Sequence, residues 1–126
     1  MNGQAPLQIL LVEDNPINLL MAQGTLAYLG HQVTTAGNGQ EAVDAFAKGA
    51  FDLILMDLTM PVMDGYQASA AILSQAREAG QKEPVIVALS ANLEDEEKQR
   101  CREHGVTRWL NKPISPDEFA ELARTL

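Results

Sequence analysis

Five polar side chains of this sequence stand where short apolar segments end, and together their types could do chemistry. They are Glu13, Asp14, Asp57, Ser90 and Lys112. Three of the five are carboxylates, and at about 4 Å with an effective dielectric constant near 20 each like-charge pair costs roughly 4 kcal/mol. Carboxylates held this close either retain a proton or bind a cation. Mg²⁺ suits such a site because it prefers a few carboxylates together with water and phosphate oxygens.

An aspartate at such a site can also act as a nucleophile and form an aspartyl phosphate. The transferred phosphoryl group then needs charge neutralisation on its oxygens. A Mg²⁺ ion, the ammonium group of Lys112 and the hydroxyl group of Ser90 could each take one of these oxygens. The five side chains are therefore typical of a magnesium-dependent phosphoryl-transfer site in which one carboxylate is left to react.

Short apolar segments alternate along the chain with segments of helical pattern. The predicted strands are 7–12, 32–36, 53–56, 85–89 and 107–110. Each is followed by a predicted helix, and the helices begin near Pro16, Asn38, Asp64, Asp95 and Pro116. Apolar strands that alternate with helices predict a parallel sheet covered on both faces. The expected α/β fold is a doubly wound, five-stranded parallel sheet with five helices, whose functional residues lie at the carboxyl ends of the strands.

The helix starts carry local signals. Asn15 is a good N-cap before Pro16, and Asn38 with Glu41 has the spacing of a capping box. The apolar side of the first helix is assigned to Ile17, Leu20, Met21, Leu26 and Leu29. We therefore expect these five side chains to share one side of that helix and to pack on the sheet.

The 126 residues suit a single domain, and the composition limits its partners. Residues 1–6 are expected to be a disordered lead, and residues 7–126 to form the domain. The formal net charge of -8 argues against direct binding to nucleic acid or to an anionic membrane, because phosphate groups demand clustered Lys and Arg. Cys101 is the only cysteine, so no intramolecular disulfide is possible. The longest apolar runs are far below the roughly 20 residues that span a bilayer, so we expect a cytoplasmic location, and we favour a monomer.

Four segments at the predicted strand ends resemble the response-regulator receiver family of two-component phosphorelays. They are residues 11–15 (LVEDN), 57–65 (DLTMPVMDG), 90–91 (SA) and 112–113 (KP). The resemblance covers residues 7–126, with the segments in the family's order, and implies a flavodoxin-like fold with strand order 2-1-3-4-5. It also implies that Asp57 is the phosphoryl acceptor, assisted by Ser90 and Lys112.

The same resemblance implies a set of ligands for Mg²⁺. Asp14 would bind the ion directly, Glu13 through water and Thr59 through its backbone carbonyl group. Asp57 would be a further ligand as well as the acceptor. The cofactor expected from the resemblance is therefore a single Mg²⁺ ion beside the reacting carboxylate.

Two conformational features are also implied by the resemblance. One is a cis peptide bond between Lys112 and Pro113, which is plausible because X-Pro bonds adopt cis at low cost. The other is a switch in which Ser90 moves inward on phosphorylation and an aromatic residue, here Trp109, follows it. Trp109 is a departure from the family pattern, since that position usually holds Tyr or Phe.

The partner implied by the resemblance is a phosphohistidine on a histidine kinase or on a histidine-phosphotransfer domain. Residues 13–18 (EDNPIN) and 60–65 (MPVMDG) are similar to receivers attached to hybrid sensor histidine kinases. We favour that origin over a stand-alone single-domain response regulator. The helical partner would dock near residues 15–18 and beside Pro113.

Two other functions fit part of the pattern. A phosphohydrolase similar to the haloacid dehalogenases also uses an Asp nucleophile after a parallel strand, but it needs a second Asp two residues later, where this chain has Thr59. A degenerate receiver would act only as a binding module, but the five polar side chains are all present. We therefore expect the domain to accept a phosphoryl group without being a turnover enzyme, although the parent chain could be a histidine kinase.

Overall fold

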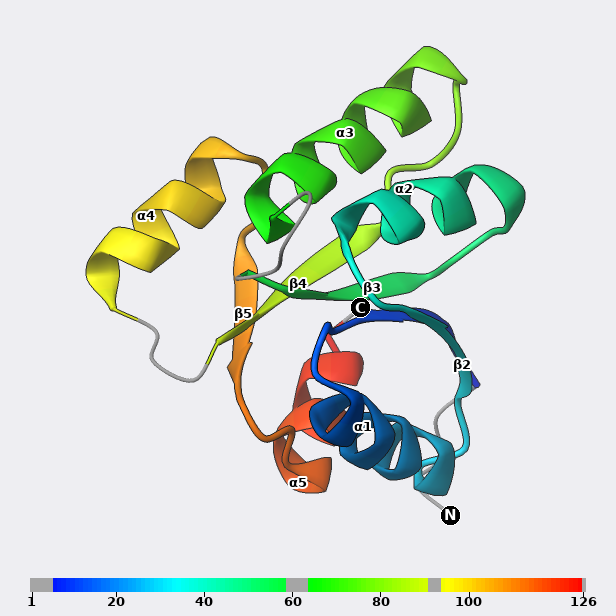
Figure 1. The fold of residues 1–126 in the computed structure, drawn as a ribbon, viewed down its shortest axis with the longest axis vertical. Helices are drawn as coiled ribbons and strands as arrows, with labels where there is room; N and C mark the ends of the chain where they lie inside the picture. The colour runs from blue at the N-terminus through cyan, green and yellow to red at the C-terminus, as the bar shows by residue number, and fades with distance from the viewer. Residues whose placement is uncertain (1–5, 59–63, 91–93, 126) are drawn as a thin grey trace.

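The computed structural model describes residues 6–58, 64–90 and 94–125, which form a parallel sheet with helices on both faces (Figure 1). The strands are β1 (Gln8–Val12), β2 (Gln32–Ala36), β3 (Leu53–Asp57), β4 (Val85–Ser90) and β5 (Arg108–Asn111). The helices are α1 (Pro16–Tyr28), α2 (Gly39–Lys48), α3 (Gly65–Glu78), α4 (Asp95–Glu103) and α5 (Pro116–Ala123). The strand order is β2-β1-β3-β4-β5, and all neighbouring strands are parallel. The predicted fold, with its strand order and five helices, is confirmed.

Two apolar cores lie on opposite faces of the sheet, because successive side chains of a strand point to opposite faces. Ile9 and Leu11 of β1 pack with residues of α1 and α5 on one face. Leu10 and Val12 pack with residues of α2, α3 and α4 on the other face. Figure 1 shows the same division, with α1 and α5 together on one side and the other three helices across the sheet. The central strands are therefore buried on both faces, which explains their continuous apolar sequences.

The strand ends lie where the site needs them. Asp57 is the last residue of β3, and Ser90 is the last residue of the neighbouring β4. The predicted fifth strand is observed one residue later than expected, at Arg108–Asn111, because Ser90 pairs with Asn111 in the β4–β5 register. The chain therefore leaves β5 directly into Lys112, at the carboxyl edge of the sheet.

The prediction for the buried side of α1 is wrong for three of its five residues. Ile17 and Leu20 are each 70% exposed and Met21 is 56% exposed. The side chains that pack on the sheet are Leu19, Ala22, Leu26 and Leu29. Apolar residues occupy more than one side of this helix, so the sequence pattern alone could not tell the packed side from the exposed one.

Among the residues that the structure describes, no helix is both long and apolar enough to cross a membrane.

The predicted caps fix where the helices start. The Asn15 side chain accepts hydrogen bonds from the N–H groups of Ile17 and Asn18, at 2.9 and 3.0 Å. Asn38 likewise accepts from the N–H group of Glu41 at 2.8 Å. The Glu41 carboxylate in turn accepts from the N–H group of Gly37, one residue earlier than a standard capping box. These bonds satisfy backbone donors that a helix leaves unpaired in its first turn.

Candidate functional site

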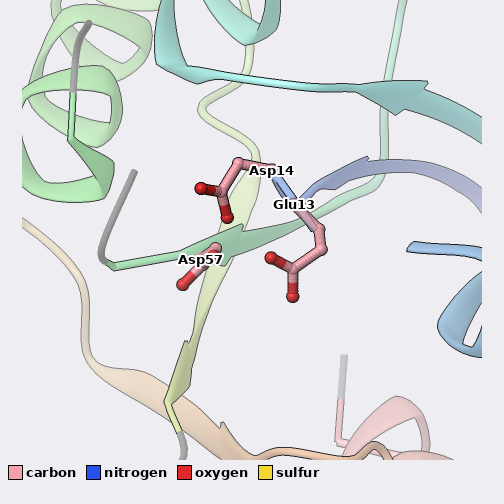
Figure 2. A group of neighbouring side chains, drawn as sticks. All are labelled: Glu13, Asp14 and Asp57. Carbon is pink, nitrogen blue, oxygen red and sulfur yellow. The ribbon is translucent and has the colours of Figure 1, made fainter. Parts of the chain in front are cut away.

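An acidic cluster lies where β1 and β3 end side by side. Glu13 and Asp14 follow β1, and Asp57 ends β3, which pairs with β1. One carboxylate oxygen from each of the three residues lies within 4.8 Å of the others. Figure 2 shows the three side chains gathered at these strand ends. Glu13 and Asp57 are each 3% exposed, whereas Asp14 is exposed, so the cluster is reached from solvent on the Asp14 side.

Lys112 bridges the two buried carboxylates. Its Nζ atom lies 2.9 Å from Oε1 of Glu13 and 3.0 Å from Oδ1 of Asp57. The backbone N–H group of Lys112 donates to the carbonyl oxygen of Ser90 at 2.9 Å, which ties the lysine to the end of β4. The Lys112–Pro113 peptide bond is cis, as predicted. Three of the predicted site residues, from three different strand ends, are therefore in direct contact.

The electrostatics of the site favour a shared proton or a cation. Burial, followed by the hydrogen bond with Glu13, raises the pKa of Asp57 to about 7, although Lys112 opposes the shift. Burial alone would raise the pKa of Glu13, but its hydrogen bonds to Asp57, Lys112 and the N–H group of Asn15 lower it instead. Burial would lower the pKa of Lys112, but Glu13 and Asp57 raise it, so the ammonium form persists. One positive charge thus faces two buried carboxylates, and Asp57 holds a proton more tightly than an ordinary aspartate.

Gly65, the first residue of α3, fixes the backbone beside Asp57. A Cβ atom at Gly65 would lie 2.2 Å from the carbonyl oxygen of Asp57 and 2.8 Å from Cα of Leu58. The Gly65 N–H group donates to the carbonyl oxygen of Leu58 at 3.2 Å. Only a residue without a side chain allows this approach. The sequence motif contains Gly65, but sequence reasoning missed this role; a glycine directly after the helix cap Asp64 is the signal that could have found it.

The other predicted site residues are placed as follows. Ser90 lies one residue beyond Leu89, the β4 partner of Asp57, and is half-buried. Trp109 is half-buried on β5, on the face covered by α4. Lys98 and Arg102 of α4 lie over its ring, with Nζ at 5.5 Å and Cζ at 5.3 Å from the ring centroid. Thr59 lies outside the described residues, as does most of the predicted lead.

A hollow of about 400 Å³ adjoins the cluster between α1 and the segment after β5. Glu13 and Lys112 line its end at the acidic cluster. The rest of its lining includes Asn18, Met21, Thr25, Leu89, Pro113 and Ile114. Two parts of the predicted docking region, Asn18 and Pro113, lie in this lining, whereas Met21 and Ile114 were not predicted to lie there. Met21, one of the exposed apolar residues of α1, therefore lines a hollow that leads to the site.

This fold, with two buried carboxylates in contact with a lysine at the carboxyl edge of its sheet, defines a receiver domain. The family model described as the response regulator receiver domain matches residues 9–124, and the chain belongs to this family.

Individual relatives indicate which kinds of protein contain receiver domains similar to this chain. The sensor protein GacS of Pseudomonas syringae pv. syringae is 41% identical over 122 residues, which cover 97% of this chain and 13% of GacS. The chain thus spans only a small part of the curated relative that it matches. The chain is a receiver domain of two-component phosphorelay signalling that is similar to the receiver parts of sensor and hybrid histidine kinases.

Two solved structures are similar over nearly the whole chain. The receiver domain of the Pseudomonas aeruginosa sensor histidine kinase PA1611, solved with a magnesium ion in its active site cleft, has a TM-score of 0.81 and 34% identity. The alignment covers 96% of this chain and 97% of that one. The Saccharomyces cerevisiae complex of the histidine phosphotransfer signaling protein Ypd1 with the receiver domain of Ssk1 has a TM-score of 0.87 and 30% identity, covering 94% and 86% of the two chains.

Proposed function

We propose that Asp57 is the residue of this receiver domain that accepts the phosphoryl group, and that a phosphohistidine is the donor. The observation that carries the proposal is the contact of Lys112 with Asp57 and Glu13, at 3.0 and 2.9 Å, at the end of β3. In this contact the nucleophile, which is the carboxylate, and one group that can neutralise phosphoryl charge, which is the ammonium, are already in place. Asp57 is the last residue of the central strand β3, whereas Glu13 and Asp14 come after the end of β1.

The reaction needs few protein groups. An Asp57 carboxylate oxygen attacks the phosphorus atom, a P–O bond forms, and the P–N bond to the donor imidazole breaks with its electron pair passing to the ring nitrogen. The ammonium group of Lys112 neutralises one phosphoryl oxygen, and the Ser90 hydroxyl donates to another. Since Asp57 must react as a carboxylate, its raised pKa opposes the step, and the positive charge of Lys112 partly offsets this cost.

The acidic cluster fits the Mg²⁺ ion that receiver domains bind. Its three carboxylates can approach a common point, and two of them are buried where their charges are poorly solvated. Asp14 and Asp57 would hold the ion, with Glu13 acting through water and the carbonyl group of Thr59 as a further ligand. When bound, Mg²⁺ supplies positive charge to the phosphoryl oxygens.

The partner in this proposal is a histidine kinase or a histidine-phosphotransfer domain. Ile17, Leu20 and Met21 expose apolar surface on α1, and the hollow between Met21 and Pro113 leads to Lys112. Clustered exposed apolar residues mark a protein-binding surface. The similarity to the receiver in the Ypd1 complex supports a helical phosphohistidine carrier as the occupant. We further propose that the chain is the receiver part of a hybrid sensor histidine kinase, with residues 7–126 forming that domain.

The experiment is intact-mass measurement after incubation with acetyl phosphate, with and without Mg²⁺. The native chain is compared with Asp57→Asn and with the matched control Asp44→Asn, which changes an exposed carboxylate on α2. We expect one phosphoryl group on the native chain and on the control, dependent on Mg²⁺, and none on Asp57→Asn. An adduct that persists in Asp57→Asn would refute the assignment. No adduct on any chain, with acetyl phosphate or a phosphohistidine donor, would favour the degenerate binding module.

A further inference from the structure

The first turn of α3 is held between Asp57 on one side and α4 on the other. On the inner side, Gly65 lies against the backbone of Asp57 and Leu58, so closely that no Cβ atom fits. Its N–H group donates to the carbonyl oxygen of Leu58, and its own carbonyl oxygen accepts a 2.7 Å hydrogen bond from the buried Ser69 hydroxyl. Any displacement of this turn therefore moves the backbone that carries Asp57.

On the outer side, Arg100 of α4 contacts both residues that flank Gly65. Its Cζ atom lies 4.1 Å from the centroid of the Tyr66 ring. Its Nη2 atom lies 4.0 Å from Oδ2 of Asp64. A guanidinium group stacks on an aromatic face and attracts a carboxylate at the same time, which a lysine does less well. Arg100 thus joins α4 to the start of α3 mainly through the Tyr66 ring, and the exposed 4.0 Å ion pair with Asp64 adds a weaker contact on the other side of the glycine.

Tyr66 and Asp64, the two residues that flank Gly65, connect α4 with the first turn of α3. Tyr66 is 6% exposed, and the ring of His104 lies 5.4 Å from its own, so the ring is fixed between α4 and the core. Asp64 caps α3 through a 2.9 Å hydrogen bond from the N–H group of Gln67. Both residues are direct chain neighbours of Gly65 at the start of α3. A displacement of Asp64 or Tyr66 would therefore also displace Gly65, which packs against the backbone of Asp57.

Charged side chains supply several of the contacts between α4 and its neighbours. Of the nine residues of α4, only Cys101 is buried. The contacts of Lys98 and Arg102 with Trp109 hold the helix to β5, and those of Arg100 hold it to α3. Arg100 therefore contributes a contact between α4 and the start of α3 that involves neither Ser90 nor Trp109.

We propose that Arg100 is a positioning residue for Asp57, acting through Tyr66 and Asp64 on the first turn of α3. Its effect on phosphorylation rests on the proposed function of Asp57, whereas its effect on the α3 turn does not. By reciprocity, a change in the backbone at Asp57 must also alter the contact between Arg100 and Tyr66. Arg100 thereby provides a second connection between the site and α4, besides the one through Ser90 and Trp109.

The test combines amide hydrogen exchange with phosphorylation by acetyl phosphate in the presence of Mg²⁺. Arg100→Gln removes the charge and the stacking group, and Arg100→Lys keeps only the charge. The matched control is Arg77→Gln, at the other end of α3, which loses a surface ion pair of 3.0 Å with Glu83. We expect Arg100→Gln to speed exchange of the Gly65 amide about fivefold relative to the Ile72 amide of the same helix. We expect its phosphorylation to slow about three- to tenfold, since a small misplacement of a nucleophile is costly.

Arg100→Lys should fall between Arg100→Gln and the native chain, and Arg77→Gln should match the native chain in both measurements. Equal exchange at Gly65 in Arg100→Gln and Arg77→Gln would overturn the proposal. So would faster exchange at Gly65 and Ile72 alike, because that outcome means general destabilisation. Faster exchange at Gly65 with native phosphorylation kinetics would also overturn it. If the native chain takes up no phosphoryl group, the proposed function fails, and the Gly65 exchange alone still decides whether Arg100 positions the turn.

Discussion

The ammonium group of Lys112 lies 3.0 Å from the carboxylate of Asp57, so the proposed nucleophile is paired with a positive charge before any donor arrives. The same ammonium group lies 2.9 Å from Glu13. Lys112 therefore has two effects in the proposed reaction: it lowers the pKa of Asp57 against the effects of burial and Glu13, and it offers a charge to the incoming phosphoryl group.

Replacing Lys112 with Met should cut phosphorylation by acetyl phosphate about 100-fold, because a preorganised charge on the transferred group is lost. It should also raise the pKa of Asp57 further, which NMR titration of the Asp57 carboxyl carbon measures directly. Lys82→Met, which changes an exposed lysine, is the control and should behave as the native chain does. An unchanged Asp57 titration in Lys112→Met would contradict the contact.

Asp57→Asn should stabilise the metal-free protein at high pH. The folded pKa of Asp57, about 7, lies above its ordinary value of 3.8, because of burial and then the hydrogen bond with Glu13. The folded state therefore binds the proton more tightly, and the associated stability is lost as the pH rises through about 7. Urea unfolding should show Asp57→Asn more stable than the native chain by about 1–3 kcal/mol near pH 8, with the difference shrinking toward pH 4. Parallel pH profiles of the two proteins would exclude the raised pKa.

Protonation of His31 should destabilise the fold. Burial lowers its pKa below 6.5, its Nδ1 atom accepts a 3.0 Å hydrogen bond from the N–H group of Leu7, and its ring lies 5.5 Å from that of Phe119. Since the folded state resists the proton, this contribution is present above about pH 6.5 and is lost as the pH falls through the folded pKa. Asp57 acts in the opposite direction, so urea unfolding is best compared between Asp57→Asn and the double variant with His31→Gln. The double variant should lose less stability on acidification; an identical slope would assign the acid sensitivity to other groups.

Two glycine substitutions should have opposite effects on stability. Gly65→Ala forces a Cβ atom to within 2.2 Å of the Asp57 carbonyl oxygen and should lower the free energy of unfolding by about 2 kcal/mol or more. Gly24→Ala, in the exposed middle of α1 with no atom within 4 Å of the new Cβ, should raise it by about 0.5–1 kcal/mol. Thermal unfolding of both variants checks the pair. Tolerance of alanine at Gly65 would contradict the close approach of α3 to Asp57.

A charged residue on the exposed side of α1 should slow phosphoryl transfer from a protein donor without slowing phosphorylation by acetyl phosphate. Leu20→Glu changes a residue that is 70% exposed, so the fold should be retained. We expect phosphoryl transfer from a histidine-phosphotransfer protein to slow about tenfold, because the apolar docking surface is lost. Uptake from acetyl phosphate, which needs no docking, should stay unchanged. Ala47→Glu, on the exposed side of α2, is the control; equal transfer rates for the two variants would place the partner elsewhere.

The order of elements and the meeting of three predicted site residues at one sheet edge could be predicted from the sequence, because those features depend on local signals. Apolar β-branched segments and cap residues such as Asn15 mark the strands and helix starts, and the carboxyl ends of parallel strands must meet at one edge. The common edge of the parallel strands is enough to bring Glu13, Asp57 and Lys112 together. The ligand role of Thr59 and the movement of Trp109 on phosphorylation stay predictions.

The contacts that depend on how elements pack against each other could not be predicted. The exposed side of α1 is one example: Met21 and Leu26 are both apolar, and only the packing of the helix on the sheet leaves the first exposed and buries the second. The contact of Arg100 with Tyr66 is another, since the residues are 34 positions apart and belong to different helices. Charged residues on a polar helix give no signal of a specific partner.

Trp109 gives the domain a built-in optical probe. It is the sole tryptophan of the chain, and its indole ring lies beneath Lys98 and Arg102 of α4. Its fluorescence intensity and emission maximum depend on those nearby charges and on its access to water. A shift of α4 relative to β5 can therefore be followed in real time without a label, at the residue most directly tied to the predicted switch.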